Sequence, residues 1–108
     1  MTGRLPTGIL ASALIRRVNN AGGFATVRAK GDAQAGSMLL MLAERGRPIR
    51  MMERGIGPDG TTTLLDSTPR DDPEHYWRRR RASDPDLWVI ELDVADAERF
   101  AAETILDD

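Results

Sequence analysis

The stretch Met38-Leu39-Leu40-Met41-Leu42-Ala43 is a short, uninterrupted apolar run in a sequence of 108 residues. A run of this length is typical of a central strand of a β-sheet. It follows the glycine-containing loop Gly31–Gly36 and precedes Arg45-Gly46-Arg47, which predicts a hairpin connection. We therefore expect Met38–Ala43 to form a central strand with turns on both sides.

Four further segments have the composition of strands. They are Phe24–Ala29, Ile49–Glu53, Thr61–Leu65 and Leu87–Asp93. In the last of these, Trp88, Ile90 and Leu92 alternate and should form one apolar face. Because short loops join the first four strands, the sequence favours an antiparallel meander.

Three segments are predicted to be helical. The first carries apolar residues at helical spacing from Ile9 to Val18, with Thr7 as the expected N-cap and Gly22 as the left-handed terminator. The second begins at Asp72-Pro73-Glu74 and ends near Ser83. The third runs from about Ala95 to about Leu106.

The order of these segments, α-β-β-β-β-α-β-α, predicts a small two-layer α+β domain. We expect a mostly antiparallel sheet of about five strands with helices packed on one face. The length is that of a single domain, residues 1–108.

Composition narrows the class of protein. Apolar residues make up 41% and charged residues 30%, as in globular proteins, and there is no cysteine. No apolar run approaches the ~20 residues that cross a bilayer. Residues 1–54 carry a net charge of +6 and residues 55–108 a net charge of −8, which we expect to neutralise each other on folding. The sequence predicts a soluble cytoplasmic protein that needs no cofactor.

A candidate anion site lies around Arg28 and Lys30, because Gly31 and Gly36 could free backbone N–H groups for a phosphate or carboxylate. The segment lacks the Lys-Ser/Thr of a P-loop, and a strand follows it rather than a helix. An ordinary turn, with Asp32 capping its own backbone, is the competing interpretation.

Asp84 and Asp86 could ligate a hard metal ion together with carboxylates of the following strand. Asp86 and Glu91 differ by an odd number of residues, so they point to opposite faces of a strand. The lone His75 cannot build a structural zinc site without cysteine. We therefore expect Asp84 and Asp86 to shape the turn around Pro85, and we expect no metal.

Four consecutive arginines, Arg78–Arg81, follow Tyr76 and Trp77 and suggest binding of single-stranded nucleic acid. However, helical residues advance 100° each, so the four side chains wrap around the axis instead of forming one stripe. Acidic residues also flank the run on both sides. The sequence therefore disfavours nucleic-acid binding and favours a solvated helix face.

Two groups of residues resemble the pattern of a known family. The first comprises Ala13-Leu14-Ile15-Arg16-Arg17, Ala21-Gly22-Gly23-Phe24-Ala25, Arg28-x-Lys30-Gly31-Asp32 and Ala35-Gly36. The second is Asp84-Pro85-Asp86-Leu87-Trp88-Val89-Ile90-Glu91. Their order and separation resemble a domain-of-unknown-function family of small proteins, mostly from alphaproteobacteria, across about residues 5–93. That family commonly has a Trp in its first helix, where this sequence has Ile9-Leu10-Ala11. The resemblance supports the α+β fold and implies no known reaction, cofactor or partner.

These observations favour a non-catalytic binding or protein-interaction module over an enzyme, because the sequence offers no set of nucleophile, base and orienting group. The alternative is an enzyme or binder of a small anionic ligand near Arg28 and Gly31–Gly36. A homodimer formed through an open sheet edge is also compatible with the sequence. The candidate binding residues are Arg16, Arg17, Arg28, Gly31, Asp32, Gly36, Asp84 and Asp86.

Overall fold

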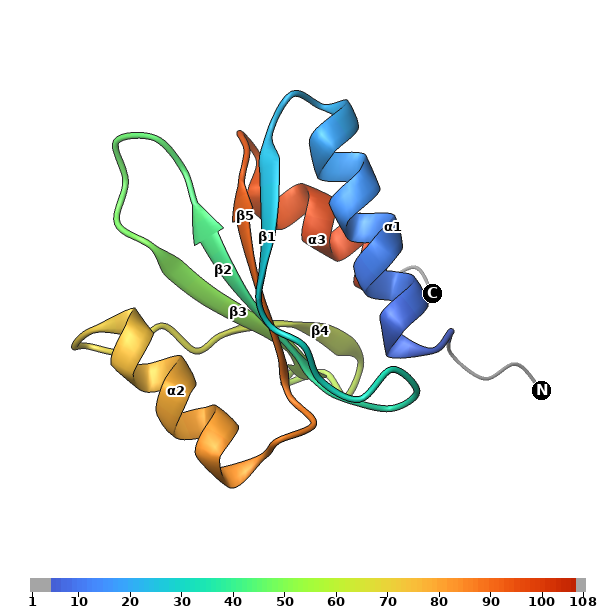
Figure 1. Ribbon diagram of the computed structural model, residues 1–108, viewed down its shortest axis with the longest axis vertical. Coiled ribbons are helices and arrows are strands. Elements are labelled where there is room, and N and C mark those ends of the chain that lie inside the picture. The colour runs from blue at the N-terminus through green and yellow to red at the C-terminus, as the bar shows by residue number, and fades with distance from the viewer. Residues whose placement is uncertain (1–4, 107–108) are drawn as a thin grey trace.

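Five strands form one open sheet in the order β1-β5-β2-β3-β4, as the computed structural model shows for residues 5–106, the part of the chain that it describes (Figure 1). The strands are β1 (Phe24–Ala29), β2 (Met38–Ala43), β3 (Arg50–Ile56), β4 (Thr62–Asp66) and β5 (Trp88–Asp93). The helices are α1 (Thr7–Asn20), α2 (Pro73–Ser83) and α3 (Ala97–Ile105). The predicted α+β class, the order of the elements and the central place of Met38–Ala43 are confirmed.

The sheet is antiparallel except where β5 lies beside β2. Strands β2, β3 and β4 form the expected meander, with neighbours pairing antiparallel. The meander does not extend to β1, because β5 lies between β1 and β2, antiparallel to the first and parallel to the second. The expectation that β1 pairs with β2 is therefore wrong. Helix α2 makes this arrangement accessible, because it carries the chain from the edge strand β4 back to the middle of the sheet.

The helices cover both faces of the sheet, so the expectation that all of them share one face is wrong for α2. Helices α1 and α3 lie on one face with Leu40 and Leu42 of β2. Helix α2 lies on the other face, where its Trp77 packs with Leu39 and Met41. Because β2 is apolar at successive positions, it serves both cores, and the molecule has three layers instead of two (Figure 1).

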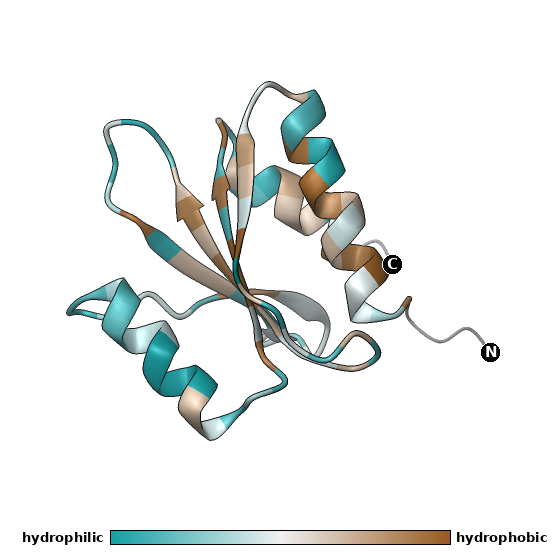
Figure 2. Ribbon diagram, viewed as in Figure 1, coloured by the Kyte–Doolittle hydropathy of each residue, from teal (hydrophilic) through white to brown (hydrophobic). Residues whose placement is uncertain are grey.

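The two sides of the sheet are held differently. Helix α1 buries a stripe of residues that includes Leu10, Ala11, Leu14 and Val18. Helix α2 buries only Trp77, and Figure 2 shows it as mostly hydrophilic beside the apolar strands. Burial of apolar surface can therefore hold α1 in place, whereas α2 also needs polar contacts.

Cap positions agree with the sequence at two places and differ at one. Asp72 accepts the backbone N–H of Glu74 at 3.1 Å, and Gly22 has a φ of 85°, as expected for a cap and a left-handed terminator. Thr7 was expected as the N-cap of α1, but it is the first helical residue and Pro6 takes the cap position. Within the described residues, no helix has the length and apolar character needed to cross a membrane.

Candidate functional site

The loop between β1 and β2 brings Gly31, Asp32 and Gly36 together with Asp86. The carbonyl of Asp86 accepts the N–H of Asp32 at 3.0 Å. The carbonyl of Asp32 in turn accepts the N–H of Gly36 at 3.2 Å and the indole N–H of Trp88 at 2.8 Å. Four of the eight candidate residues therefore meet at one place, through their backbones.

The two glycines are required by a close approach of backbones. A Cβ atom at Gly31 would lie 2.0 Å from the carbonyl oxygen of Asp86, and one at Gly36 would lie 2.2 Å from the same atom. The Asp32 carboxylate accepts the N–H of Ala35 at 2.8 Å, which is the turn-capping role that the sequence suggested. The N–H groups of Asp32 and Gly36 already donate to backbone carbonyls. An anion at this loop would have to displace these hydrogen bonds.

The same loop closes the beginning of α1. The Thr7 hydroxyl donates to the carbonyl of Gly36 at 2.7 Å, and the N–H of Gly8 donates to the carbonyl of Ala33 at 2.8 Å. Backbone donors of the first helical turn, which attract anions in other proteins, are thus bound by the loop's own carbonyls. The loop Gly31–Gly36 therefore links the beginning of α1 to the segment that enters β5, and we call this set of contacts the clasp.

Asp84 and Asp86 form the turn that leads from α2 into β5. The Asp84 carboxylate accepts the N–H of Asp86 at 3.1 Å, and Asp84 itself ends the helix. Among residues 5–106 there is no cluster of three or more His, Cys, Asp or Glu side chains that could hold a metal ion.

Arg28 lies on the α2 face, away from the loop's clasp. Its guanidinium forms an ion pair with Glu91 of β5 at 2.8 Å and a second ion pair with Glu74 of α2. The guanidinium carbon also lies 5.8 Å from the ring centre of Trp77. The hydrogen bonds that Arg28 donates to Glu91 and Glu74 raise its pKa despite its partial burial. Arg28 thus joins two strands and a helix, and its charge is balanced by carboxylates of the same chain.

Arg16 and Arg17 lie at the other end of α1 from the clasp. Arg17 pairs with Glu103 of α3 at 2.6 Å and donates to the Thr104 hydroxyl at 3.2 Å, so it ties the two helices together. Arg16 is exposed. The eight candidate residues therefore lie in three separate places and do not form one concave site.

The sequence did not identify a cluster that joins α2 to β3. Arg80 donates to both oxygens of Glu53 at 2.8 and 2.9 Å and to the Tyr76 hydroxyl at 2.8 Å. The hydrogen bond from Arg80 is the main cause that lowers the pKa of Glu53. The signal in the sequence was a lone acid, Glu53, within the predicted strand Ile49–Glu53, together with an arginine-rich helix later in the chain.

Arg81 also turns inward. It donates to the carbonyls of Lys30 at 3.3 Å and Leu87 at 3.1 Å, and it contacts the carbonyl of Pro85 as well. Half of the four-arginine run therefore holds the fold together. The expected solvated face is confined to Arg78 and Arg79, which are exposed.

Two accessible features among residues 5–106 present apolar side chains, besides single exposed residues such as Ile9. The first is the outer edge of β1, where the residues Phe24 and Val27 are 72% and 41% exposed. The second is a cavity of about 470 Å³ near the beginning of α1, lined in part by Leu10, Met38 and Ile105. Neither was found from the sequence, because Phe24 and Val27 read as ordinary strand residues and the cavity is formed by segments far apart in the chain.

A family model described as "Protein of unknown function (DUF1491)" matches residues 5–102. The chain belongs to the DUF1491 family. The resemblance expected from the sequence is thereby confirmed, and the family's description assigns no activity, ligand or partner.

Three solved structures have a similar fold, and two of them are of DUF1491 family proteins. The chain is 36% identical to a DUF1491 family protein from Caulobacter crescentus CB15, whose crystal structure matches with a TM-score of 0.77 over 90% of this chain and 94% of that one. An NMR structure of a DUF1491 family protein from the same organism matches at 36% identity and a TM-score of 0.75, over 92% and 94% of the two chains. The solution structure of protein Atu0922 from A. tumefaciens matches at 28% identity and 0.69, over 87% and 89%. The search of curated proteins finds no significant match.

Proposed function

We propose that this DUF1491 protein is a non-catalytic interaction module that receives an extended segment of another protein along the edge of β1. The observation that carries the proposal is the exposure of Phe24 and Val27 on an edge strand. Three residues apart, these side chains point to opposite faces of the sheet, so a strand added at this edge would meet an apolar contact on each face.

The charged side chains support a binding role over a catalytic one. Arg17, Arg28 and Arg80, the arginines with partly buried ion pairs to acids of other elements, are bound to carboxylates that hold helices in place. Arginines in such ion pairs stabilise the fold, and releasing them to take part in catalysis would weaken the attachment of α2 or α3.

The pairing of β1 with β5 limits how long a partner segment can lie along β1. The pairing of β1 with β5 shifts between Val27 and Ala29, so Arg28 sits in a bulge that bends the strand. A straight added strand can follow β1 from Phe24 to Val27 and must then diverge. We therefore propose a short contact of about four residues.

Charge at the far end of β1 defines the partner's chemistry. Lys30 is exposed and has no carboxylate partner in residues 5–106, and the guanidinium of Arg81 lies against the Lys30 carbonyl. The nearby Asp32 carboxylate is turned into its own loop by the N–H of Ala35. The segment that fits carries apolar residues opposite Phe24 and Val27, followed by an acidic residue near Lys30. The proposal includes the cytoplasmic location expected from the sequence.

Site-specific photo-crosslinking tests this proposal. The exposed Thr26 is replaced by p-benzoylphenylalanine, and the protein is irradiated in native lysate. The expected product is a crosslink to an extended apolar and acidic segment of one other protein. The double variant F24K/V27K should lose it, and I9K, which changes an exposed apolar residue of α1 instead, should keep it.

Two outcomes would reject the proposal. A crosslink to a second copy of this chain would replace the partner protein by a homodimer. A crosslink that persists unchanged in F24K/V27K would show that the β1 edge is not the binding surface.

A further inference from the structure

Strand β4 (Thr62–Asp66) is the second edge of the sheet, and no other strand of residues 5–106 pairs with its outer side. Edge strands of natural proteins often carry a bulge, a proline or a basic residue, which discourages pairing with another chain. β1 has such a feature, the bulge at Arg28, whereas β4 pairs with β3 without a shift of register. β4 also contains no proline, lysine or arginine, and its one charged residue is Asp66 at the end. The outer edge of β4 is therefore open to pairing.

The hydrogen bonds between β3 and β4 define which backbone groups point outward. The N–H of Gly57 donates to the carbonyl of Thr61 at 2.8 Å, and the N–H of Ser67 donates to the carbonyl of Met51 at 2.8 Å. Hydrogen-bonded residues alternate along an antiparallel strand, so the odd-numbered residues from Thr61 to Ser67 direct their backbone groups toward β3. The residues whose N–H and C=O groups point outward are therefore Thr62, Leu64 and Asp66.

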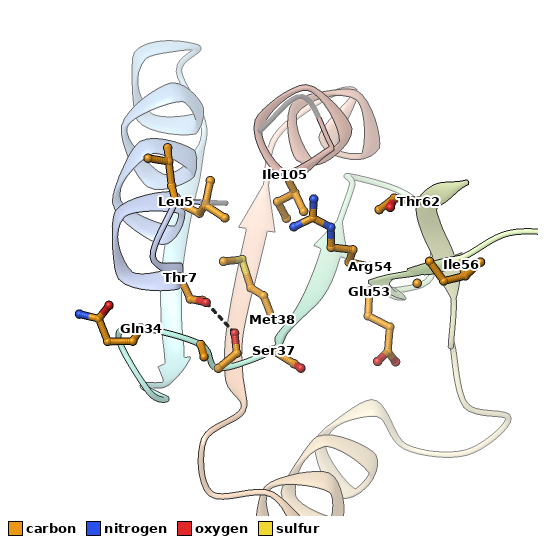
Figure 3. A pocket seen from close by; sticks show the side chains of 14 residues that line it. Leu5, Thr7, Gln34, Ser37, Met38, Glu53, Arg54, Ile56, Thr62 and Ile105 are labelled. Carbon is orange, nitrogen blue, oxygen red and sulfur yellow. Dashed lines mark hydrogen bonds between the residues drawn. The ribbon is translucent and has the colours of Figure 1, made fainter. Parts of the chain in front are cut away.

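The side chains of β4 alternate between the two faces of the sheet. Thr62 lines the cavity at the beginning of α1 (Figure 3), and Leu64 packs against the core that α1 and α3 cover. Thr63 and Leu65 lie on the opposite face, where a Cβ atom at Gly55 would come within 2.2 Å of the Leu65 Cδ1. Helices α1 and α3 pack on β1 and β2, and the nearer of these strands is two places from β4. These two helices therefore leave room for another strand beside β4.

The β4 edge is complementary to itself. A second β4 that runs antiparallel and overlaps the whole strand sets Leu64 opposite its own copy and Thr62 opposite Asp66. The outward N–H and C=O groups of the two strands then face each other. The Asp66 carboxylate accepts hydrogen bonds from the N–H and the hydroxyl of Thr68, and it keeps acceptor capacity for the Thr62 hydroxyl of the second copy. This register brings no like charges opposite each other.

We propose that the chain forms a homodimer in which the β4 strands of two copies pair antiparallel about Leu64. The pairing joins two five-stranded sheets into one, and it follows the two-fold symmetry that is commonest among homo-oligomers. On the face away from α1, Thr63 of each copy lies against Leu65 of the other. One short strand from each copy should bury less than the about 1,200 Å² of stable interfaces, so we expect a Kd on the order of 100 μM. The dimer leaves the β1 edge free, because β1 and β4 are opposite edges of the sheet.

Isotope-filtered NMR on a mixture of labelled and unlabelled protein tests the pairing and its register together. The total concentration is about 1 mM, roughly tenfold above the expected Kd. In an antiparallel pair, opposite residues that are not hydrogen-bonded to each other have the closest α carbons. We therefore expect a nuclear Overhauser effect between the α protons of Thr63 in one copy and Leu65 in the other. Sedimentation equilibrium should show the average mass rising toward twice that of one chain over the same concentration range.

Two matched variants assign the dimer to one edge of the sheet. T63K/L65K places lysine side chains opposite each other on both sides of Leu64, so this variant should stay monomeric. F24K/V27K, at the opposite edge, should still form the dimer, and the dimer and the proposed β1 contact can therefore fail separately.

Three outcomes would overturn the proposal. The first is a mass that stays that of one chain up to about 1 mM, tenfold above the expected Kd. The second is a dimer that persists in T63K/L65K or is lost in F24K/V27K. The third is a dimer without the effect between Thr63 and Leu65. The measurements on the unmodified protein need no variant, so they decide the question even if T63K/L65K fails to fold.

Discussion

Arg80 of α2 binds both carboxylate oxygens of Glu53 in β3, at 2.8 and 2.9 Å, across the interface between α2 and the sheet. Because Trp77 is the only buried residue of this helix, the ion pair replaces contacts that an apolar stripe would otherwise provide. The side chains of Arg80 and Glu53 are 32% and 23% exposed. The strength of this ion pair should therefore lie between that of weak surface pairs and that of buried pairs, whose charges are costly to remove from water.

Removing the arginine should therefore destabilise the fold measurably. We expect R80M to lower the free energy of unfolding by about 2 kcal/mol, because Glu53 would remain half-buried without its partner. Chemical denaturation measures this change. The control R16M, at an exposed arginine of α1, should change the same free energy by less than about 0.5 kcal/mol. Equal effects of the two substitutions would show that the pair does not hold α2.

The same pair predicts a dependence of stability on pH. The pKa of Glu53 in the folded protein lies below its ordinary value of 4.5, so the stabilisation is complete above that pH and is lost as the pH falls through the folded-state pKa. We expect the difference in Tm between the unmodified protein and R80M to be constant near neutral pH and to shrink below about pH 4. Thermal unfolding monitored by circular dichroism would show it. A difference that stays constant as the pH falls from 4.5 until the protein unfolds in acid would contradict this role of Glu53.

The clasp around Asp86 predicts that Gly31 cannot accept a side chain. In G31A the new methyl group would lie 2.0 Å from a backbone carbonyl, so we expect a loss of about 3 kcal/mol or more in unfolding free energy. The control G8A places its methyl group 3.4 Å from Ala33, an ordinary contact, and should be neutral or slightly stabilising because alanine favours a helix. Comparable unfolding free energies for the two variants would rule out the close approach at Asp86.

The arginine run predicts little affinity for nucleic acid. Arg80 and Arg81 point into the protein, and the exposed Arg78 already faces Glu74 at 3.4 Å. We expect the protein to pass through a heparin or single-stranded DNA column at low salt. Retention that weakens with salt, and that R78Q/R79Q removes, would restore nucleic-acid binding as a function.

Much of the fold could be predicted from local sequence patterns. The apolar run Met38–Ala43, the cap at Asp72 and the terminator Gly22 each reflect interactions within a few residues, and they lie where the pattern placed them. The turn at Asp84 and Asp86 is local in the same way.

The features that were missed depend on contacts between distant segments. The placement of α2 on the second face is set by Trp77 and by the ion pairs of Arg28 with Glu74 and of Arg80 with Glu53. No periodic apolar stripe in the helix indicates this placement. The insertion of β5 between β1 and β2 is likewise a long-range choice, because an apolar strand can pair with either neighbour. Arg28 looked like an anion-binding residue because its carboxylate partners, Glu74 and Glu91, are 46 and 63 residues away.

Amide hydrogen exchange at β1 is the sharpest test of whether a partner segment pairs with this edge. In the free protein, the amides of Phe24–Val27 that point away from β5 should exchange rapidly, because this edge is unpaired. In the complex isolated from native lysate, we expect these amides to exchange about tenfold or more slowly, as in a newly paired strand, while the amides of the exposed N-terminal part of α2 do not change. Unchanged exchange at Phe24–Val27 in a stable complex would contradict the proposal that the β1 edge is the interaction surface.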